Sequence, residues 1–217
     1  MDTTPPQNQN NLQPTKLDLK KQRFEEALQR EKRKKFLWIG GSVAGVVALV
    51  GLIGYYATRP QEPLPGISYP NQGQDHVPLD HQDTYNSNPP TSGPHYASPA
   101  NWGVYDYEVP DKIFIHNLEH GGIWISYKSS VGKDVVGALN DMVKKFGGSK
   151  LVMAPRAADD TDIAIAAWGH LLKFNLSGGI LSDQQKKDIE NFYLRLKDRG
   201  PENVPDFMAG VDPKNIK

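Results

Sequence analysis

The sequence predicts an α+β fold, with a single N-terminal transmembrane helix followed by one domain whose small, mostly antiparallel sheet is covered by two helices. Three observations support this prediction. Residues 36–58 are an unbroken apolar run, strand-like and amphipathic helical segments alternate after Pro110, and the 217-residue chain has no cysteine. A domain of about 140 residues can bury an adequate core without disulfides. The lack of cysteine excludes thiolate metal sites and cysteine nucleophiles.

The apolar run is long enough to cross a membrane. As a helix, residues 36–58 extend about 33 Å, which matches the hydrocarbon thickness of a bilayer. Trp38 and Tyr55 lie near its two ends, where an aromatic belt is expected. A cleaved secretory signal has a shorter apolar region, about 7–15 residues, and a small-x-small cleavage site. No Ala-x-Ala follows here, so we predict an uncleaved signal anchor.

The charges that flank this run predict its orientation. Residues 30–35 hold five Lys or Arg, whereas only Arg59 follows closely on the other side. The positive-inside rule therefore places the N-terminus in the cytoplasm and the C-terminal domain outside the cell membrane, which the chain crosses once. The whole chain has no net charge, and this argues against a general nucleic-acid binder, which needs a basic face.

Composition divides the chain into four parts. Residues 1–35 are a cytoplasmic tail, which is predicted to be disordered where it is rich in Pro, Gln and Asn and to become a basic juxtamembrane helix towards its end. The anchor at 36–58 is followed by a stalk at 59–74 and by the extracytoplasmic α+β domain at 75–217. That domain opens with a long Pro-rich loop, and because the loop also holds many aromatic residues we expect it to be ordered.

Periodicity predicts the regular elements in the order ββαββα, with the helices on one face of the sheet. The expected elements are a hairpin of strands at 112–116 and 122–127, a helix over 133–146, strands at 151–154 and 163–168, and a helix over 182–197. Ser182 and Gln185 form a capping-box pattern at the start of the last helix.

A pair of histidines carries the sharpest functional signal, in the string His116-Asn-Leu-Glu119-His120-Gly-Gly. In a hairpin the two imidazoles face each other across the strands, with Cβ atoms about 5 Å apart. In a helical turn, residues i and i+4 also share a face. Either backbone brings the two rings together.

Three interpretations of this string remain open. The histidines can be structural, forming hydrogen bonds with loop carbonyls. They can bind a metal, copper or zinc, or another small ligand, because imidazole is the usual ligand where thiolates are absent. The string also matches His-x-x-Glu-His, the inverted metallopeptidase motif, in which Glu119 would activate water. That mechanism needs a long helix, whereas Gly-Gly and a β-rich run follow here.

A rigid loop offers a third histidine. The segment Asn88-Pro-Pro-Thr-Ser-Gly-Pro-His95-Tyr96 is stiffened by three prolines, so it can hold one side chain at a fixed place, or simply cover a sheet edge. The predicted metal ligands are His95, His116, Glu119 and His120. Further candidate ligands are Tyr85, Tyr96, His76 and His81.

The ordered set of these motifs resembles a known bacterial family. Asn88–Tyr96, Trp102–Tyr105, His116–Gly122 and Ala166–Gly169 follow one another as in the domain of unknown function 3105. The resemblance covers residues from about 75 to 208. It implies an extracytoplasmic domain, often tethered by one N-terminal helix, and implies a shared site for the four predicted ligands, but no activity.

The sequence therefore predicts a membrane-anchored extracytoplasmic domain that binds a metal ion, copper or zinc, or a small ligand through a His-rich loop face. The first alternative is a structural or protein-interaction module of the cell envelope, whose partner the sequence does not name. The second alternative is a metal-dependent hydrolase. Catalysis is left undecided.

Overall fold

The computed structural model describes residues 15–59, 62–202 and 204–216. The chain forms two compact units, Met1–Glu62 and Pro63–Lys217. Residues 1–14, which hold the Pro, Gln and Asn-rich part of the predicted tail, lie outside the described residues.

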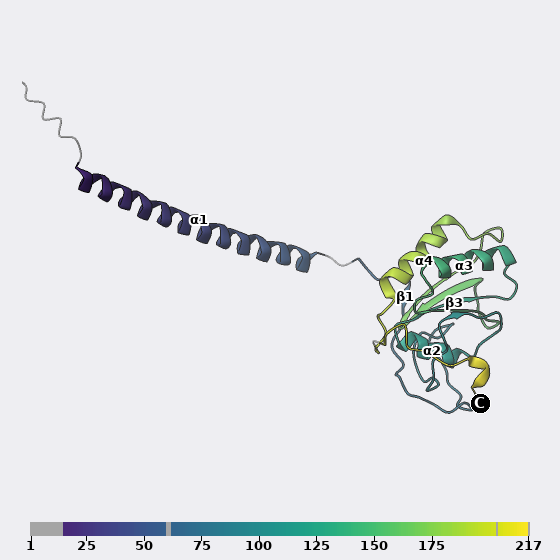
Figure 1. Ribbon diagram of the computed structural model, residues 1–217. Coiled ribbons are helices and arrows are strands. Elements are labelled where there is room, and N and C mark those ends of the chain that lie inside the picture. The colour runs from purple at the N-terminus through teal and green to yellow at the C-terminus, as the bar shows by residue number, and fades with distance from the viewer. Residues whose placement is uncertain (1–14, 60–61, 203, 217) are drawn as a thin grey trace, which may run out of the picture. The chain divides into compact units, whose positions relative to one another are not determined.

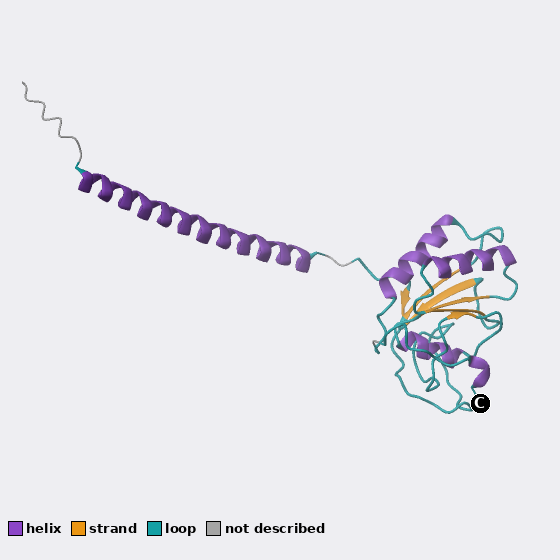
Figure 2. Ribbon diagram, in the orientation of Figure 1, coloured by secondary structure: helices purple, strands orange, loops and turns teal. Residues whose placement is uncertain are grey.

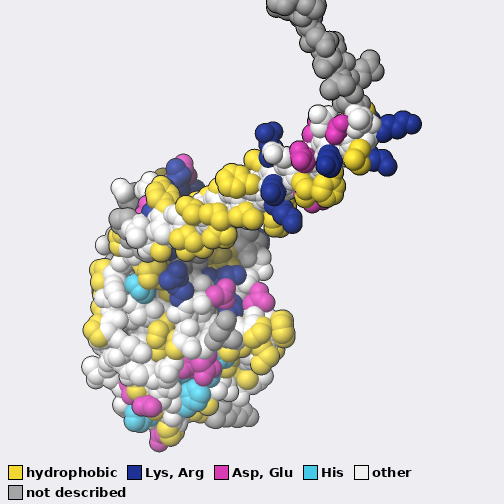
Figure 3. Space-filling model, turned by 90° about the vertical axis from the view of Figure 1, so that its left-hand side faces the viewer, with side chains coloured by type: hydrophobic (Ala, Val, Ile, Leu, Met, Phe, Trp, Pro, Cys, Tyr) yellow, Lys and Arg dark blue, Asp and Glu magenta, His cyan; other side chains and the backbone are white. Residues whose placement is uncertain are grey.

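The described part of the first unit contains one long helix, α1 (Lys16–Thr58), so the basic juxtamembrane segment and the apolar run are continuous. Its N-terminus is closed by a capping box, in which the Thr15 hydroxyl accepts from the Asp18 amide and the Asp18 carboxylate accepts from the Thr15 amide. By length and composition α1 is a candidate membrane span. Figure 3 shows its continuous apolar surface and the Lys and Arg side chains towards its N-terminal end.

The second unit is α+β, with a six-stranded mixed sheet in the order β1-β6-β5-β3-β4-β2. The strands are β1 (Ile67–Ser68), β2 (Gly103–Val104), β3 (Ile123–Tyr127), β4 (Leu151–Pro155), β5 (Ile163–Ala167) and β6 (His170–Phe174). β4 pairs in parallel with β3 and β2, and the other neighbours are antiparallel. The strands predicted at 151–154 and 163–168 are confirmed, and β3 lies between them.

Helices cover both faces of this sheet, whereas the sequence predicted helices on one face only (Figures 1 and 2). α3 (Lys133–Lys145) and α4 (Asp183–Leu196) confirm the two predicted helices and pack on one face, where Ile125 contributes to the core. On the opposite face, the adjacent Trp124 of β3 packs with residues of α2 (Asp111–Glu119). Alternate side chains of a strand point to opposite faces, so each core receives its own set from β3. A short 3-10 helix, Pro213–Asn215, lies near the C-terminus.

The predicted hairpin is wrong, because its first strand is the helix α2. The run Ile113-Phe114-Ile115 is made of β-branched and aromatic residues, which favour strands, but all three side chains are buried. In a fully buried element periodicity cannot separate helix from strand, and tertiary packing overrides local propensity. The helix begins directly after Pro110 and ends before Gly121, which has a φ of +77°.

The compact unit begins at Pro63, ahead of the expected boundary at residue 75. Within the expected stalk, Ile67 pairs with Leu171 of β6, and the Tyr69 amide donates to the Gly169 carbonyl over 2.8 Å. The following Pro-rich loop is ordered, as predicted. The Tyr85 hydroxyl, for example, donates to the Pro94 carbonyl over 2.6 Å.

Candidate metal centre

Two elements carry the four side chains of the candidate site. Helix α2 presents His116 and Glu119, which are three residues apart and therefore share a face. The Pro-rich loop presents His76 and His95, which are paired by a parallel β-bridge. In this bridge the Val77 amide donates to the His95 carbonyl over 2.8 Å, so the two loop segments lie side by side.

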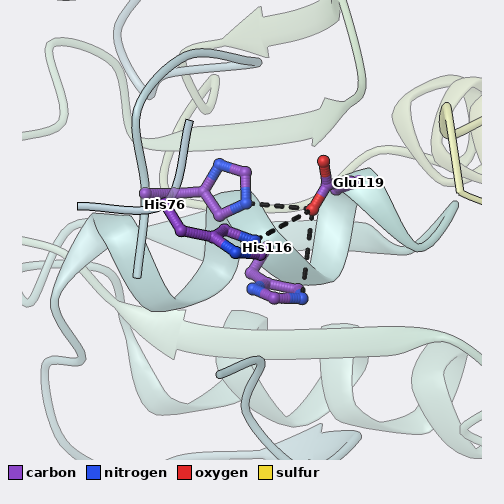
Figure 4. A group of neighbouring side chains, drawn as sticks. His76, His116 and Glu119 are labelled. Atoms are coloured by element: carbon purple, nitrogen blue, oxygen red, sulfur yellow. Dashed lines mark hydrogen bonds and ion pairs between the residues drawn. The ribbon is translucent and has the colours of Figure 1, made fainter. Parts of the chain in front are cut away.

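Three imidazole nitrogens converge on one carboxylate oxygen. The Nε2 atoms of His95, His76 and His116 lie 3.0, 3.7 and 3.9 Å from Glu119 Oε2. The four ligand atoms all lie within 4.8 Å of one another. Figure 4 shows the dashed lines from the imidazoles ending on this single oxygen. The arrangement places four donors of the type that metal ions bind around a small common volume.

Backbone carbonyls determine which ring nitrogen faces the centre. His95 Nδ1 lies 2.8 Å from the Gly93 carbonyl, and His116 Nδ1 lies 2.7 Å from the Tyr96 carbonyl. A carbonyl oxygen only accepts hydrogen bonds, so both Nδ1 atoms carry the proton. In the neutral rings each Nε2 then directs a lone pair at the centre, which is the tautomer of a metal-bound histidine.

Burial places a carboxylate and imidazole lone pairs close together in this cluster. The side chains of His95, Glu119 and His116 are 0, 3 and 5% exposed, whereas that of His76 is 47% exposed. A neutral His95 directs a lone pair at an acceptor 3.0 Å away, and these two atoms repel each other unless a proton or a metal ion lies between them. The site is therefore built to hold positive charge and opens to solvent at His76.

Burial also keeps the helix imidazoles neutral. The pKa of His116 is lowered to about 4, chiefly by desolvation, against the opposing Tyr96 carbonyl and with smaller contributions from the neighbouring His120, His95 and His76 rings. Desolvation also lowers the pKa of His120, against the opposing carboxylates of Glu202 and Glu119. Both rings are neutral at pH 7 and need lose no proton before they bind a metal.

The structure brings three of the four predicted ligands together and places the fourth beside them. His95, His116 and Glu119 share the cluster, and the fourth position belongs to His76, which sequence reasoning gave only as a further candidate. His120 lies just beyond the end of α2, with Nε2 3.1 Å from His116 Nε2 and 3.3 Å from Glu202 Oε2. The candidate ligands thus come from a helix and a loop, rather than from a loop face alone.

The other candidates have different contacts. His81 Nε2 lies 3.1 Å from Asp83 Oδ1, the Tyr85 hydroxyl is used within the loop, and Tyr96 supports His116 through its carbonyl. No signal in the sequence ranks His76 above His81, because the distinction depends on the bridge that pairs His76 with His95.

A buried arginine, which sequence reasoning missed, links the two elements of the site. Arg156 follows β4, and its guanidinium donates to both carboxylate oxygens of Asp111, over 2.8 and 2.7 Å. It also donates to Asn88 Oδ1 over 2.6 Å and to Asp159 Oδ1 over 2.7 Å. Asp111 opens α2 and Asn88 lies in the loop that carries His95. Arg156 therefore positions the helix relative to the loop.

The lowered pKa of His116 predicts that the metal-free protein loses stability in acid. The folded pKa is about 4 and the ordinary value is 6.5, so between these values the unfolded chain binds a proton that the folded chain does not. The free energy of unfolding is therefore highest, as far as His116 is concerned, above about pH 6.5. It falls by an amount on the order of 3 kcal/mol as the pH falls towards 4. Thermal unfolding of the full chain at pH 7, 5.5 and 4 measures this loss.

The variant His116→Gln lacks the titrating ring, so we expect it to lose less stability than the parent chain over the same range. His81→Gln, at an exposed histidine, is the matched control and should follow the parent. An equal loss in the parent and in His116→Gln would show that His116 does not carry this pH dependence.

Comparison with known proteins gives a family and no activity. No curated protein and no solved structure matches the chain. A family model described as "Protein of unknown function (DUF3105)" matches residues 76–206. The match includes all four residues of the cluster, its first residue being His76. It spans more than half of the chain, and the chain therefore belongs to the DUF3105 family.

Proposed function

We propose that this protein is a membrane-anchored metal-binding protein whose C-terminal unit holds a divalent cation with His76, His95, His116 and Glu119. One observation carries the proposal. Three imidazole nitrogens face a single buried carboxylate oxygen, and two of the rings have their other nitrogen fixed on a backbone carbonyl. Such outer hydrogen bonds orient metal ligands in known sites.

The donor set favours zinc or copper(II). Three imidazoles and one carboxylate supply nitrogen and oxygen donors of the kind that both ions accept. Copper(I) prefers sulfur ligands, but the chain has no cysteine, and Met142 and Met153 belong to the core on the opposite face of the sheet. These methionines therefore support packing rather than metal binding.

The position of Glu119 favours binding over hydrolysis. In the metallopeptidase pattern both histidines of His-x-x-Glu-His bind one ion while the glutamate activates water. Here Glu119 lies among the ligands, with Oε2 3.0 Å from His95 Nε2, and His120 lies outside the four-residue group. We therefore assign Glu119 as a ligand.

Replacing single ligands tests the proposal. We expect His76→Ala, His95→Ala and His116→Ala each to weaken zinc or copper(II) binding to the metal-free full chain by roughly 100-fold or more, because each removes a bond to the ion. A double variant should lose little beyond the single ones, since ligands of one ion are not additive. Calorimetric titration in detergent measures the affinities.

His76→Ala is the most informative variant because His76 is half-exposed, so its loss should leave the fold intact. His81→Ala is the matched control, since His81 has the same 47% side-chain exposure and pairs with Asp83. Unchanged metal binding in His76→Ala and His116→Ala would reject the proposed site. The alternative function, a structural or protein-interaction module of the cell envelope, would then be favoured. Metal-dependent ester or peptide hydrolysis that Glu119→Gln abolishes, with the metal still bound, would favour the hydrolase.

We further propose that α1 is an uncleaved anchor with its N-terminus in the cytoplasm. The support is the apolar run within α1 and the basic residues at 30–35 that precede it. Protease added to intact spheroplasts should then remove a reporter fused after Lys217. Without protease, the protein isolated from the membrane should have its full mass. A protected reporter would reverse the orientation, and a mature protein that begins after α1 would identify a cleaved signal sequence.

A further inference from the structure

A second set of metal ligands adjoins the first and shares one residue with it. Glu119, His120 and Glu202 each offer a ligand atom, and these atoms lie within 4.8 Å of one another. The Nε2 atom of His120 lies 3.3 Å from Glu202 Oε2 and 3.1 Å from His116 Nε2. The two sets therefore meet at Glu119 and at the facing nitrogens of His116 and His120.

We infer that the protein holds a dinuclear centre in which Glu119 bridges two divalent cations. The inner ion is bound by His76, His95 and His116, and the outer ion by His120 and Glu202. This inference rests on the proposed function, since the inner ion is the one proposed above.

The chemistry of the shared residue permits this arrangement. A carboxylate has two oxygens and about four lone-pair directions, so one carboxylate can serve two ions. Two-metal sites in proteins hold their ions about 3.5–4 Å apart. His116 and His120 meet at 3.1 Å between their Nε2 atoms, with ring planes 88° apart. The position of the second ion is marked by Glu202, whose Oε2 atom lies 3.3 Å from His120 Nε2.

Glu202 is held at the site by its backbone. Its amide donates to the Glu119 carbonyl over 3.0 Å, and the Asp198 amide donates to the Gly121 carbonyl over 2.9 Å. This approach is so close that a Cβ atom on Gly200 would lie 2.1 Å from the Glu119 carbonyl oxygen. The segment between residues 198 and 202 thus needs glycine to pack against the end of α2. Packing therefore fixes the backbone of Glu202 beside the end of α2.

Charge and exposure distinguish the two ions. The carboxylates of Glu119 and Glu202 supply two negative charges, and the nearby Lys150 is paired with Asp198. His120 and Glu202 have side chains 13 and 54% exposed, against 0–5% for the three buried inner ligands. An exposed ion with three protein ligands keeps water molecules in its remaining positions. The outer ion should therefore bind more weakly than the inner one.

Metal stoichiometry tests the inference on the metal-free full chain in detergent. Zinc titration by calorimetry should give two equivalents for the parent, the second at least about tenfold weaker than the first. Glu202→Gln and His120→Ala should each retain the first equivalent and lose the second. Glu190→Gln, at an exposed glutamate paired with Lys145, and His81→Ala should both keep two.

Copper(II) provides a readout that depends on distance. One equivalent should give an isolated paramagnetic signal, and the second should reduce the signal per ion, because two ions bridged by a carboxylate couple magnetically. Binding of a single metal equivalent by the parent chain would reject the outer ion and leave the proposed function standing. Binding of no metal would reject both the outer ion and the proposed function. Two equivalents that survive in Glu202→Gln and His120→Ala would place the second ion elsewhere and overturn the inference.

Discussion

The buried carboxylate of Glu119 is the constraint on which the rest of the site depends. A charged carboxylate inside a protein is costly unless opposite charge or donors surround it, and this one is 3% exposed. Its nearest partner, His95 Nε2 at 3.0 Å, cannot stabilise it as a neutral ring with the proton on Nδ1. A proton on His95 Nε2 would remove the repulsion for this one ring, whereas the proposed cation at the centre would interact favourably with all three imidazoles and the carboxylate at once.

The fold brings three distant segments to this carboxylate. The Pro-rich loop supplies His76 and His95, α2 supplies His116 and Glu119, and the segment before residue 203 supplies Glu202. Arg156 links the loop to the start of α2, while backbone hydrogen bonds link the end of α2 to the last segment. The supporting contacts are buried or made by the backbone, so the segments that carry the proposed ligands are positioned without an ion, which would lower the entropic cost of binding one.

Local signals in the sequence predicted part of this arrangement. The capping box at Ser182, the apolar face of the helix predicted at 133–146 and the spacing that brings the His116 and His120 rings together depend on neighbouring residues, and each is present in the structure. The helical state of 111–119 was missed because its burial on all sides, imposed by the sheet, removes the periodic signal. The roles of His76 and Glu202 depend on contacts between remote segments, which no local pattern encodes.

X-ray absorption at the zinc edge, on the full chain loaded with one equivalent, tests the central claim most directly. We expect four nitrogen or oxygen ligands at about 2.0–2.1 Å, with scattering from three imidazole rings that falls to two in His76→Ala. His81→Ala should leave the spectrum unchanged. A shell of oxygen ligands without imidazole scattering, or three imidazoles that persist in His76→Ala, would contradict the account.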